Sequence, residues 1–208
     1  TIFPNFGTTR PLRNILKVAN GKSDITKKPA GSPKLVAHPD TTFLVTNMLR
    51  SVVNEGTGAG VRSAGFTLDA AGKTGTTNDY SNAWFIGFTP QLATGVWVGY
   101  DRPRSLGKDE TGSRVAVPIW TTFMQSALAG MPAEDFPIPE KVVLVPVDLD
   151  RAGNCTRPAL MAFVVGTEPS QVCGPARFAS GVRPATALPG AVPAIAEPAA
   201  PREGGQTP

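Results

Sequence analysis

Two strand-like segments joined by a very short link place the strongest limit on how this chain can fold. Residues 82–88 read NAWFIGF and residues 93–101 read ATGVWVGYD, with Thr89-Pro90-Gln91 in the link between them. Parallel neighbours need a long crossover connection, usually a helix, and this link cannot contain one. The two segments are therefore predicted to pair as antiparallel strands.

A third candidate strand precedes them at about residues 70–77. In the last of the three, bulky side chains should occupy one face, while the other face allows close approach to the backbone. The alternating residues are Val96, Val98 and Tyr100 against Gly95, Trp97 and Gly99.

Helices are predicted on both sides of these strands. The first has Asp40 or Thr41 as its N-cap and Gly56 as its C-terminal cap. The second ends at Gly130, with Pro118 tolerable only in its first turn. The apolar residues at helical spacing are Leu44, Val45, Met48, Leu49, Val52 and Val53 in the first helix, and Ile119, Phe123, Ala127 and Leu128 in the second. Antiparallel strands bracketed by helices indicate an α+β fold, an antiparallel sheet flanked by helices.

The chain ends differ in character from this central part. Residues 13–25 favour a hairpin turning at Asn20-Gly21. Beyond residue 131, the segments 141–147 and 159–165 look like strands of a small C-terminal β extension over 132–182. Alanine, proline and glycine dominate 183–208, for which we expect a disordered tail. The first unit is expected to span 1–131.

Charge and composition exclude several classes of protein. The net charge is +4, but residues 1–50 hold eight Lys/Arg against two Asp/Glu, so the basicity is confined to one end. No aromatic-plus-basic RNA-binding pattern or basic helical stripe accompanies it, and we expect no nucleic-acid partner. No apolar run is long enough to span a membrane. The chain starts at Thr1 without a signal peptide, so we expect a piece of a longer protein.

Cys155 and Cys173 are too few for a zinc site, and His38, the only histidine, lies far from them in the sequence. They are either free thiols or a disulfide, and the residues alone leave both open. We expect no metal and no cofactor.

The stretch AGKTGTTND at 71–79 is compatible with two chemistries. A phosphate-binding loop needs glycine where Thr67 stands, and a dinucleotide loop starting at Gly56 needs glycine where Val61 stands. The other option is Lys73-Thr74-Gly75 on a strand, one of the motifs of serine acyl-transferases.

The surrounding sequence makes the second option specific. KTGTTND, AWFIGFTP, GVWVGYD and TGSRVAVPIWTTFM occur in this order, preceded by LRSVVNEGTGAG. The series resembles the C-terminal part of the transpeptidase domain of bifunctional (class A) penicillin-binding proteins. The resemblance covers about residues 10–131 strongly, and extends loosely to VPVDLDRAGN and FVVGTEPSQVC.

The resemblance implies a partial penicillin-binding/β-lactamase-like fold and a role for each residue of the motif. Lys73 and the hydroxyls of Thr74 and Thr76 would meet the carboxylate of a peptide lying along the strand. Gly75 would let that peptide approach, and the N–H of Thr76 would donate to the oxyanion. Lys73 and Thr76 are thus the expected catalytic residues, and Thr74, Gly75 and Thr76 the expected substrate-binding residues.

The family also needs S-x-x-K and S-x-N motifs before this strand. Ser105-Leu106-Gly107-Lys108 matches the first motif only in letters, and no S-x-N occurs. Tyr80-Ser81-Asn82 resembles the Y-x-N motif of related hydrolases, but both stretches follow the strand. The nucleophile is therefore expected upstream of Thr1.

The implied function is a peptidoglycan D-alanyl-D-alanine transpeptidase, with a glycosyltransferase domain further upstream and this piece inactive alone. The implied ligands are stem peptides and β-lactams, and cell-wall synthesis proteins are possible partners. The implied location is the periplasmic face of the inner membrane, where the parent is anchored and where Cys155–Cys173 pairing is favoured. The alternative is a non-catalytic module that binds cell-wall peptide or a partner protein.

Overall fold

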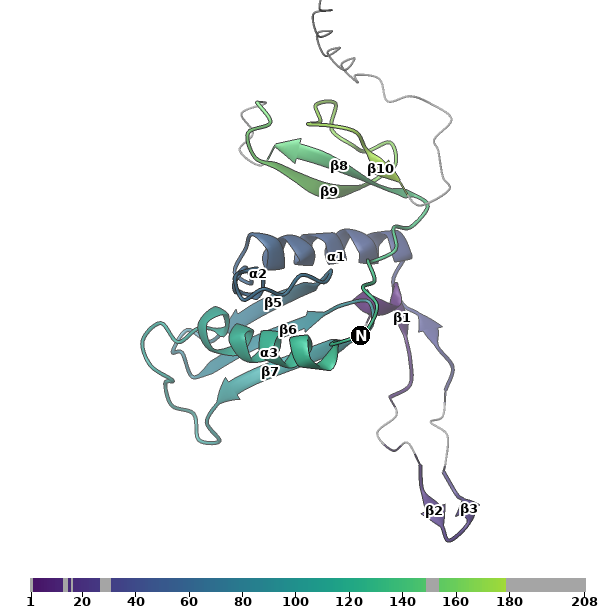
Figure 1. Cartoon of the computed structure of the whole chain (residues 1–208), viewed down its shortest axis with the longest axis vertical. Helices are drawn as coiled ribbons and strands as arrows, with labels where there is room; N and C mark the ends of the chain where they lie inside the picture. The colour runs from purple at the N-terminus through teal and green to yellow at the C-terminus, as the bar shows by residue number, and fades with distance from the viewer. Residues whose placement is uncertain (1, 13–14, 16, 27–30, 149–153, 179–208) are drawn as a thin grey trace, which may run out of the picture.

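The computed structural model describes residues 2–12, 15, 17–26, 31–148 and 154–178. The predicted disordered tail at 183–208 lies outside these residues. The α+β prediction is confirmed: two antiparallel sheets of three strands each lie on either side of one long helix (Figure 1). A second helix packs on the same face of the first sheet as the end of the long helix, in a shared hydrophobic core.

The first sheet has the strand order β5-β6-β7. Its strands are β5 (Ala71–Thr76), β6 (Asn82–Phe88) and β7 (Ala93–Gly99), all antiparallel. The short link predicts this pairing for β6 and β7. Val96 and Val98 pack against the core while Trp97 is exposed, as the predicted alternation in β7 requires. Tyr100 departs from it, because it follows the end of β7 and is 41% exposed, and the Trp97 ring lies over Gly99 on the other face.

Helix α1 (Pro39–Asn54) lies between the two sheets, and the predicted N-cap was wrong. His38 is the N-cap, with its Nδ1 atom accepting a hydrogen bond from the N–H of Asp40 (3.4 Å). Pro39 follows, and the fixed φ of proline suits the first helical position, a signal that the choice of Asp40 or Thr41 overlooked.

The predicted end and face of α1 also need correction. The helix ends at Asn54, and Gly56 does not adopt the left-handed conformation of a capping glycine. Glycine is needed there because a Cβ would lie 2.8 Å from Cα of Val52. Met48 is 58% exposed, and the buried positions include polar residues that sequence periodicity passed over. The buried residues of α1 are Thr42, Phe43, Thr46, Asn47 and Val53.

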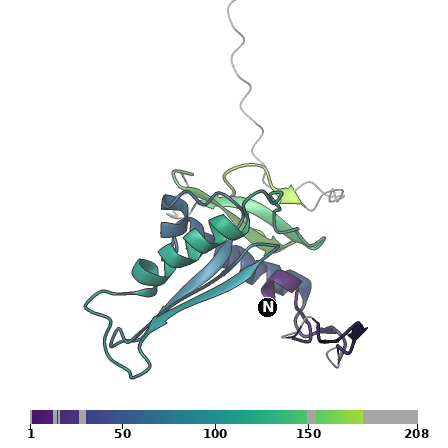
Figure 2. The same cartoon turned by 60° about the horizontal axis from the view of Figure 1, so that its bottom comes forward.

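Helix α3 (Val117–Ala127) crosses one face of the first sheet (Figure 2), and its predicted buried face was largely wrong. Ile119 and Phe123 are 52% and 49% exposed, and Ala127 is exposed too, while Leu128 is buried as expected. The helix follows a π-helical turn, η2 (Gly112–Ala116), with Pro118 in its first turn as predicted. Its buried residues are Val117, Trp120, Thr121 and Met124.

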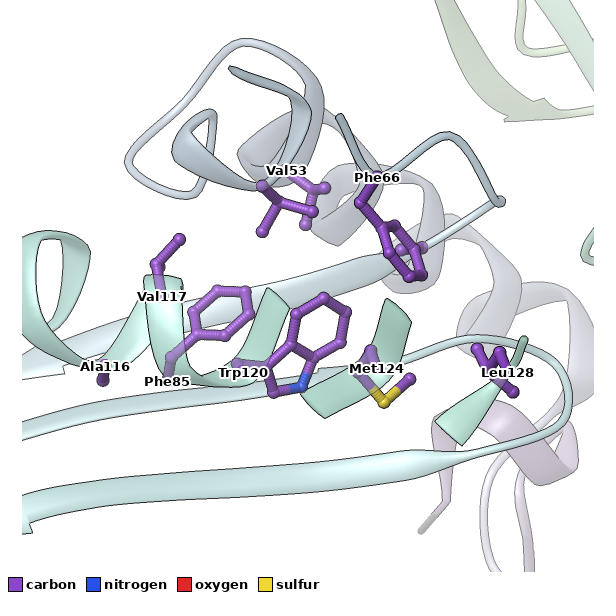
Figure 3. Packing of buried hydrophobic residues seen from close by; sticks show 10 residues of the cluster. Val53, Phe66, Phe85, Ala116, Val117, Trp120, Met124 and Leu128 are labelled. Atoms are coloured by element: carbon purple, nitrogen blue, oxygen red, sulfur yellow. The ribbon is translucent and has the colours of Figure 1, made fainter. Parts of the chain in front are cut away.

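Trp120 decides this orientation of α3. Its ring packs edge-on against Phe66 (5.6 Å between centroids) and Phe85 (5.2 Å) in the centre of the main core (Figure 3). Its indole N–H donates to the carbonyl of Thr94 (3.1 Å), so burying this large ring leaves no polar atom unsatisfied. The short helix α2 (Gly60–Ser63) adds Val61 to the same core.

The second sheet has the order β10-β8-β9, with β8 (Val142–Asp148), β9 (Pro158–Val164) and β10 (Arg177–Phe178). The predicted strands 141–147 and 159–165 match β8 and β9, whereas β10 was not predicted. Phe43, Phe88 and Phe136 pack with residues of β8 in a second hydrophobic cluster. This sheet shares its core with α1 and the first sheet, and the division at residue 131 stays a prediction.

Asn47 joins α1 to β9 directly. Its side-chain amide accepts from the N–H of Ala162 (2.9 Å) and donates to the carbonyl of Leu160 (3.4 Å). Cys155 and Cys173, in the loops beside this sheet, are joined by a disulfide.

The N-terminal segment contains a short turn, η1 (Phe3–Asn5), and two small ribbons. β1 (Thr8–Thr9) pairs with β4 (Lys34–Leu35), and β2 (Ala19–Asn20) pairs with β3 (Ser23–Asp24) in a projecting hairpin (Figures 1 and 2). Because Asn20 pairs with Ser23, the turn residues are Gly21 and Lys22, one position later than predicted.

Candidate active site

Strand β5 lies at one edge of its sheet and carries the four candidate site residues. It pairs with β6 on one side, and the described residues place no strand on its other side. The N–H of Thr77, just after β5, donates to the carbonyl of Asn82. Backbone groups of successive residues in a strand point to opposite edges, so those of Thr74 and Thr76 point away from β6.

Lys73 extends from this strand into solvent. Its ammonium donates to the carbonyl of Thr74 (3.0 Å) and lies 3.4 Å from the hydroxyl of the same residue. The position of this carbonyl agrees with a Thr74 backbone that faces the free edge. The structure thus places a cation beside the unpaired edge of β5.

The hydroxyl of Thr74 meets another hydroxyl that sequence reasoning missed. Oγ1 of Thr57, in the loop after α1, lies 2.8 Å from Oγ1 of Thr74. Thr57 belongs to the GTGAG run, which the sequence excluded as a dinucleotide loop without giving it another role. No local pattern links positions 57 and 74, and only the packing of α1 along β5 brings them together.

Gly75 and Gly112 are glycines for different reasons. A Cβ on Gly75 would only touch Cβ of Trp84 at 3.4 Å, an ordinary contact, so internal packing does not require glycine there. A Cβ on Gly112 would lie 2.2 Å from the carbonyl oxygen of Trp84 and 2.7 Å from that of Gly75. Gly112 lets η2 rest on the backbone of β5 and β6.

Gly112 also holds the side chain of Thr76. The N–H of Gly112 donates to Oγ1 of Thr76 (3.1 Å), which leaves the threonine proton available for another acceptor. Gly112 therefore supports the end of the site strand, and its place in the TGSRVAVP stretch was the only sequence signal for it.

The Tyr80-Ser81-Asn82 triplet, which resembles a catalytic motif, builds the turn between β5 and β6. The hydroxyl of Ser81 donates to Asp79 (2.9 Å), and Asn82 accepts from the indole N–H of Trp97 (2.8 Å). Hydrogen bonds from Thr77 and Ser81 hold the pKa of Asp79 below its usual range. The side chains of Asp79, Ser81 and Asn82 thus have structural partners in the turn or in β7.

The stretch from Ser105 to Lys108, which has the letters of an S-x-x-K motif, lies in an irregular loop. Ser105 accepts a hydrogen bond from the N–H of Gly107 (3.2 Å), and no helix places the serine and lysine on one face. This geometry does not meet the requirement of the motif, in which the two side chains share a helical face.

The site strand therefore places the Lys73 ammonium and the N–H of Thr76 at its open edge, with the hydroxyls of Thr74 and Thr76 on the same strand. Such a set binds and stabilises a negatively charged oxygen. Within the described ranges, no three metal-ligating side chains come together. In the same ranges, no helix has the length and apolar character needed to cross a membrane.

Comparison with known proteins agrees with this arrangement. Penicillin-binding protein 1A of Aquifex aeolicus is 39% identical over 185 residues, covering 88% of this chain and 25% of the relative. Penicillin-binding protein 1A of Rickettsia prowazekii is 43% identical over 108 residues, covering 52% of this chain and 14% of that protein. This chain thus spans a quarter or less of the length of these curated relatives.

A solved structure shows the same fold. The crystal structure of penicillin-binding protein 1A from Haemophilus influenzae aligns with a TM-score of 0.55 and 32% identity, covering 65% of this chain and 22% of that one. Residues 1–125, more than half of the chain, match the family described as the penicillin binding protein transpeptidase domain. The chain belongs to the penicillin-binding protein transpeptidase family.

Proposed function

We propose that this chain supplies the carboxylate-binding strand and one oxyanion donor of a serine-type D-alanyl-D-alanine transpeptidase that cross-links peptidoglycan. The observation that carries the proposal is the open edge of β5, where Lys73 and Thr74 lie beside backbone groups that face away from β6. Family membership supports the reaction class.

The geometry suits a peptide added to the sheet. A stem peptide that lies antiparallel to β5 can form main-chain hydrogen bonds with the outward-facing groups of Thr74 and Thr76. Its terminal carboxylate then meets the Lys73 ammonium and the threonine hydroxyls as charge-assisted partners. Gly75 has no side chain on the approach path, and internal packing does not explain its being glycine.

The chemistry proceeds by acyl transfer. A serine hydroxyl attacks the carbonyl carbon of the penultimate D-alanine, and the N–H of Thr76 donates to the oxyanion that forms. The peptide C–N bond then breaks, and D-alanine leaves with a proton. An amine of a neighbouring peptidoglycan strand attacks the acyl-serine ester, which forms the cross-link and restores the serine hydroxyl.

The serine and the S-x-N motif are proposed to lie in the parent chain outside residues 1–208, so this piece alone is inactive. A peptidoglycan glycosyltransferase domain and a membrane anchor are proposed for the same parent, with the site on the periplasmic face of the inner membrane. The Cys155–Cys173 disulfide supports this location, because disulfides persist in oxidising compartments.

The test is covalent labelling of the full-length protein with a fluorescent penicillin. Lys73→Ala should slow acylation by roughly 100-fold or more, because it removes a cation from the carboxylate site. Lys108→Ala, in the irregular loop after β7, should acylate at the normal rate. Residues 1–208 alone should remain unlabelled.

Two results would overturn the proposal. Normal acylation of Lys73→Ala would remove the role of Lys73, and labelling of residues 1–208 alone would show that the nucleophile lies within them. Reversible binding of penicillin by the full-length protein, without any covalent product, would instead indicate a non-catalytic binding module.

A further inference from the structure

The loop that follows α1 is closely fastened to the end of that helix. The N–H of Gly56 donates to the carbonyls of Ser51 and Val52, and the N–H of Gly58 donates to Val52 again (2.9 Å). A Cβ on Gly58 would lie 3.1 Å from the carbonyl oxygen of Val52, so the loop depends on a small residue there. Thr57, between these two glycines, is thereby held in a defined place.

The helix itself is anchored on the site strand. Val53, in the last turn of α1, is fully buried in the main core, and α1 packs along β5. The hydroxyl of Thr57 is therefore brought to Thr74 (2.8 Å) by tertiary packing and by a tight loop together. Thr57 is exposed, so this contact is made at the open rim of the site.

The number of protons around the Thr74 hydroxyl limits how these groups can bond. A threonine hydroxyl has one proton to donate and two lone pairs that accept. The Lys73 ammonium has donors only, so at its 3.4 Å separation Thr74 can act only as the acceptor. The contact with Thr57 has two possible directions, because either oxygen can be the donor.

Only one direction leaves Thr74 able to bind an anion. If Thr74 donated its proton to Thr57, it would have none for a carboxylate. If Thr57 donates instead, both lone pairs of Thr74 are used by Thr57 and Lys73, and its proton is directed to a ligand at the strand edge.

We propose that Thr57 is a positioning residue that donates to Thr74 and thereby orients the Thr74 proton toward the substrate carboxylate. This inference rests on the proposed function of the β5 edge as a carboxylate site. Thr57 acts through Thr74, whose hydroxyl it contacts.

The test compares two probes in the full-length protein: a penicillin with its free carboxylate and the methyl ester of the same penicillin. Thr57→Val keeps the shape of the side chain and removes the hydroxyl. The acid-to-ester ratio of acylation rates should fall by roughly tenfold, because an oriented hydrogen bond to a charged group is lost. Thr57→Ser, which keeps the hydroxyl, should restore the ratio.

The outcomes separate this inference from the proposed function. An unchanged acid-to-ester ratio in Thr57→Val, with Lys73→Ala still slow, would overturn the role of Thr57 and leave the function standing. Equal slowing with both probes would also overturn it, because loss of loop structure does not discriminate a carboxylate. Normal acylation of Lys73→Ala would instead contradict the carboxylate site itself.

Folding of the variants is checked independently of activity. The melting temperature of Thr57→Val should match that of Thr57→Ser within about 2 °C, since the exposed hydroxyl contributes little to stability. If Thr57→Val does not fold, the comparison of Thr57→Ser with Thr57→Ala decides in the same way: equal ratios would overturn the inference.

Discussion

The two sheets that flank α1 differ in whether the backbone N–H and C=O groups at their edges have hydrogen-bond partners. On one side, β9 has the N–H of Ala162 and the carbonyl of Leu160 bonded to the buried amide of Asn47. On the other side, β5 turns the backbone groups of Thr74 and Thr76 to an edge where the described residues place no strand. One helix thus lies between an edge strand, β9, to which it gives side-chain hydrogen bonds, and the edge of β5, which is open to a ligand.

This difference separates architecture from function. Buried polar groups need internal partners, and the Asn47 amide meets that need for β9. An exposed strand edge is usually protected because it can pair with another chain. An unprotected edge beside a lysine and two threonines is expected if a substrate peptide pairs with it.

The largest expected effect on stability concerns the hydrophobic core that packs against the first sheet, β5-β6-β7. Trp120→Ala should destabilise the protein by about 3–5 kcal/mol, because it leaves a cavity beside Phe66 and Phe85. Thr122→Ala, on the exposed side of the same helix, should change stability by less than about 0.5 kcal/mol. Hydrogen exchange of the β6 amides measures both, and equal effects would show that the described packing of α3 is incorrect.

A smaller effect on stability is expected at the second sheet, where Asn47 bonds to the backbone of β9. Asn47→Ala should cost about 1–3 kcal/mol, since the N–H of Ala162 and the carbonyl of Leu160 lose their partner. Met48→Ala, at the exposed neighbouring position, serves as the control. The exchange rate of the Ala162 amide should rise only in Asn47→Ala. An unchanged rate would mean that Asn47 does not satisfy the β9 backbone.

The smallest effect on stability is expected at the open edge. Gly75→Ala should alter the free energy of unfolding by less than about 0.5 kcal/mol, because the new methyl group makes only an ordinary contact with Trp84. Penicillin acylation of the full-length protein should nevertheless fall, since the methyl group stands where the peptide approaches. Loss of stability without loss of acylation would place the need for glycine in the fold.

Local pattern was enough to predict much of this fold. The positions of β5 to β9 followed from alternation and from short links, and Lys73 and Gly75 followed from a short motif in a specific context. Local pattern did not predict which faces of the helices are buried. Ile119 and Phe123 made a plausible apolar stripe on α3, but Trp120 has more surface to bury and turned the helix accordingly.

Sequence by itself determined the antiparallel pairing of β6 with β7, the family and the chemistry expected of the lysine motif. Each depends on residues close together in the chain. Tertiary structure alone decided that Asn47 bonds to the β9 backbone and that Thr57 meets Thr74. These contacts join residues that are far apart in the sequence, and no local periodicity encodes which distant groups packing brings together.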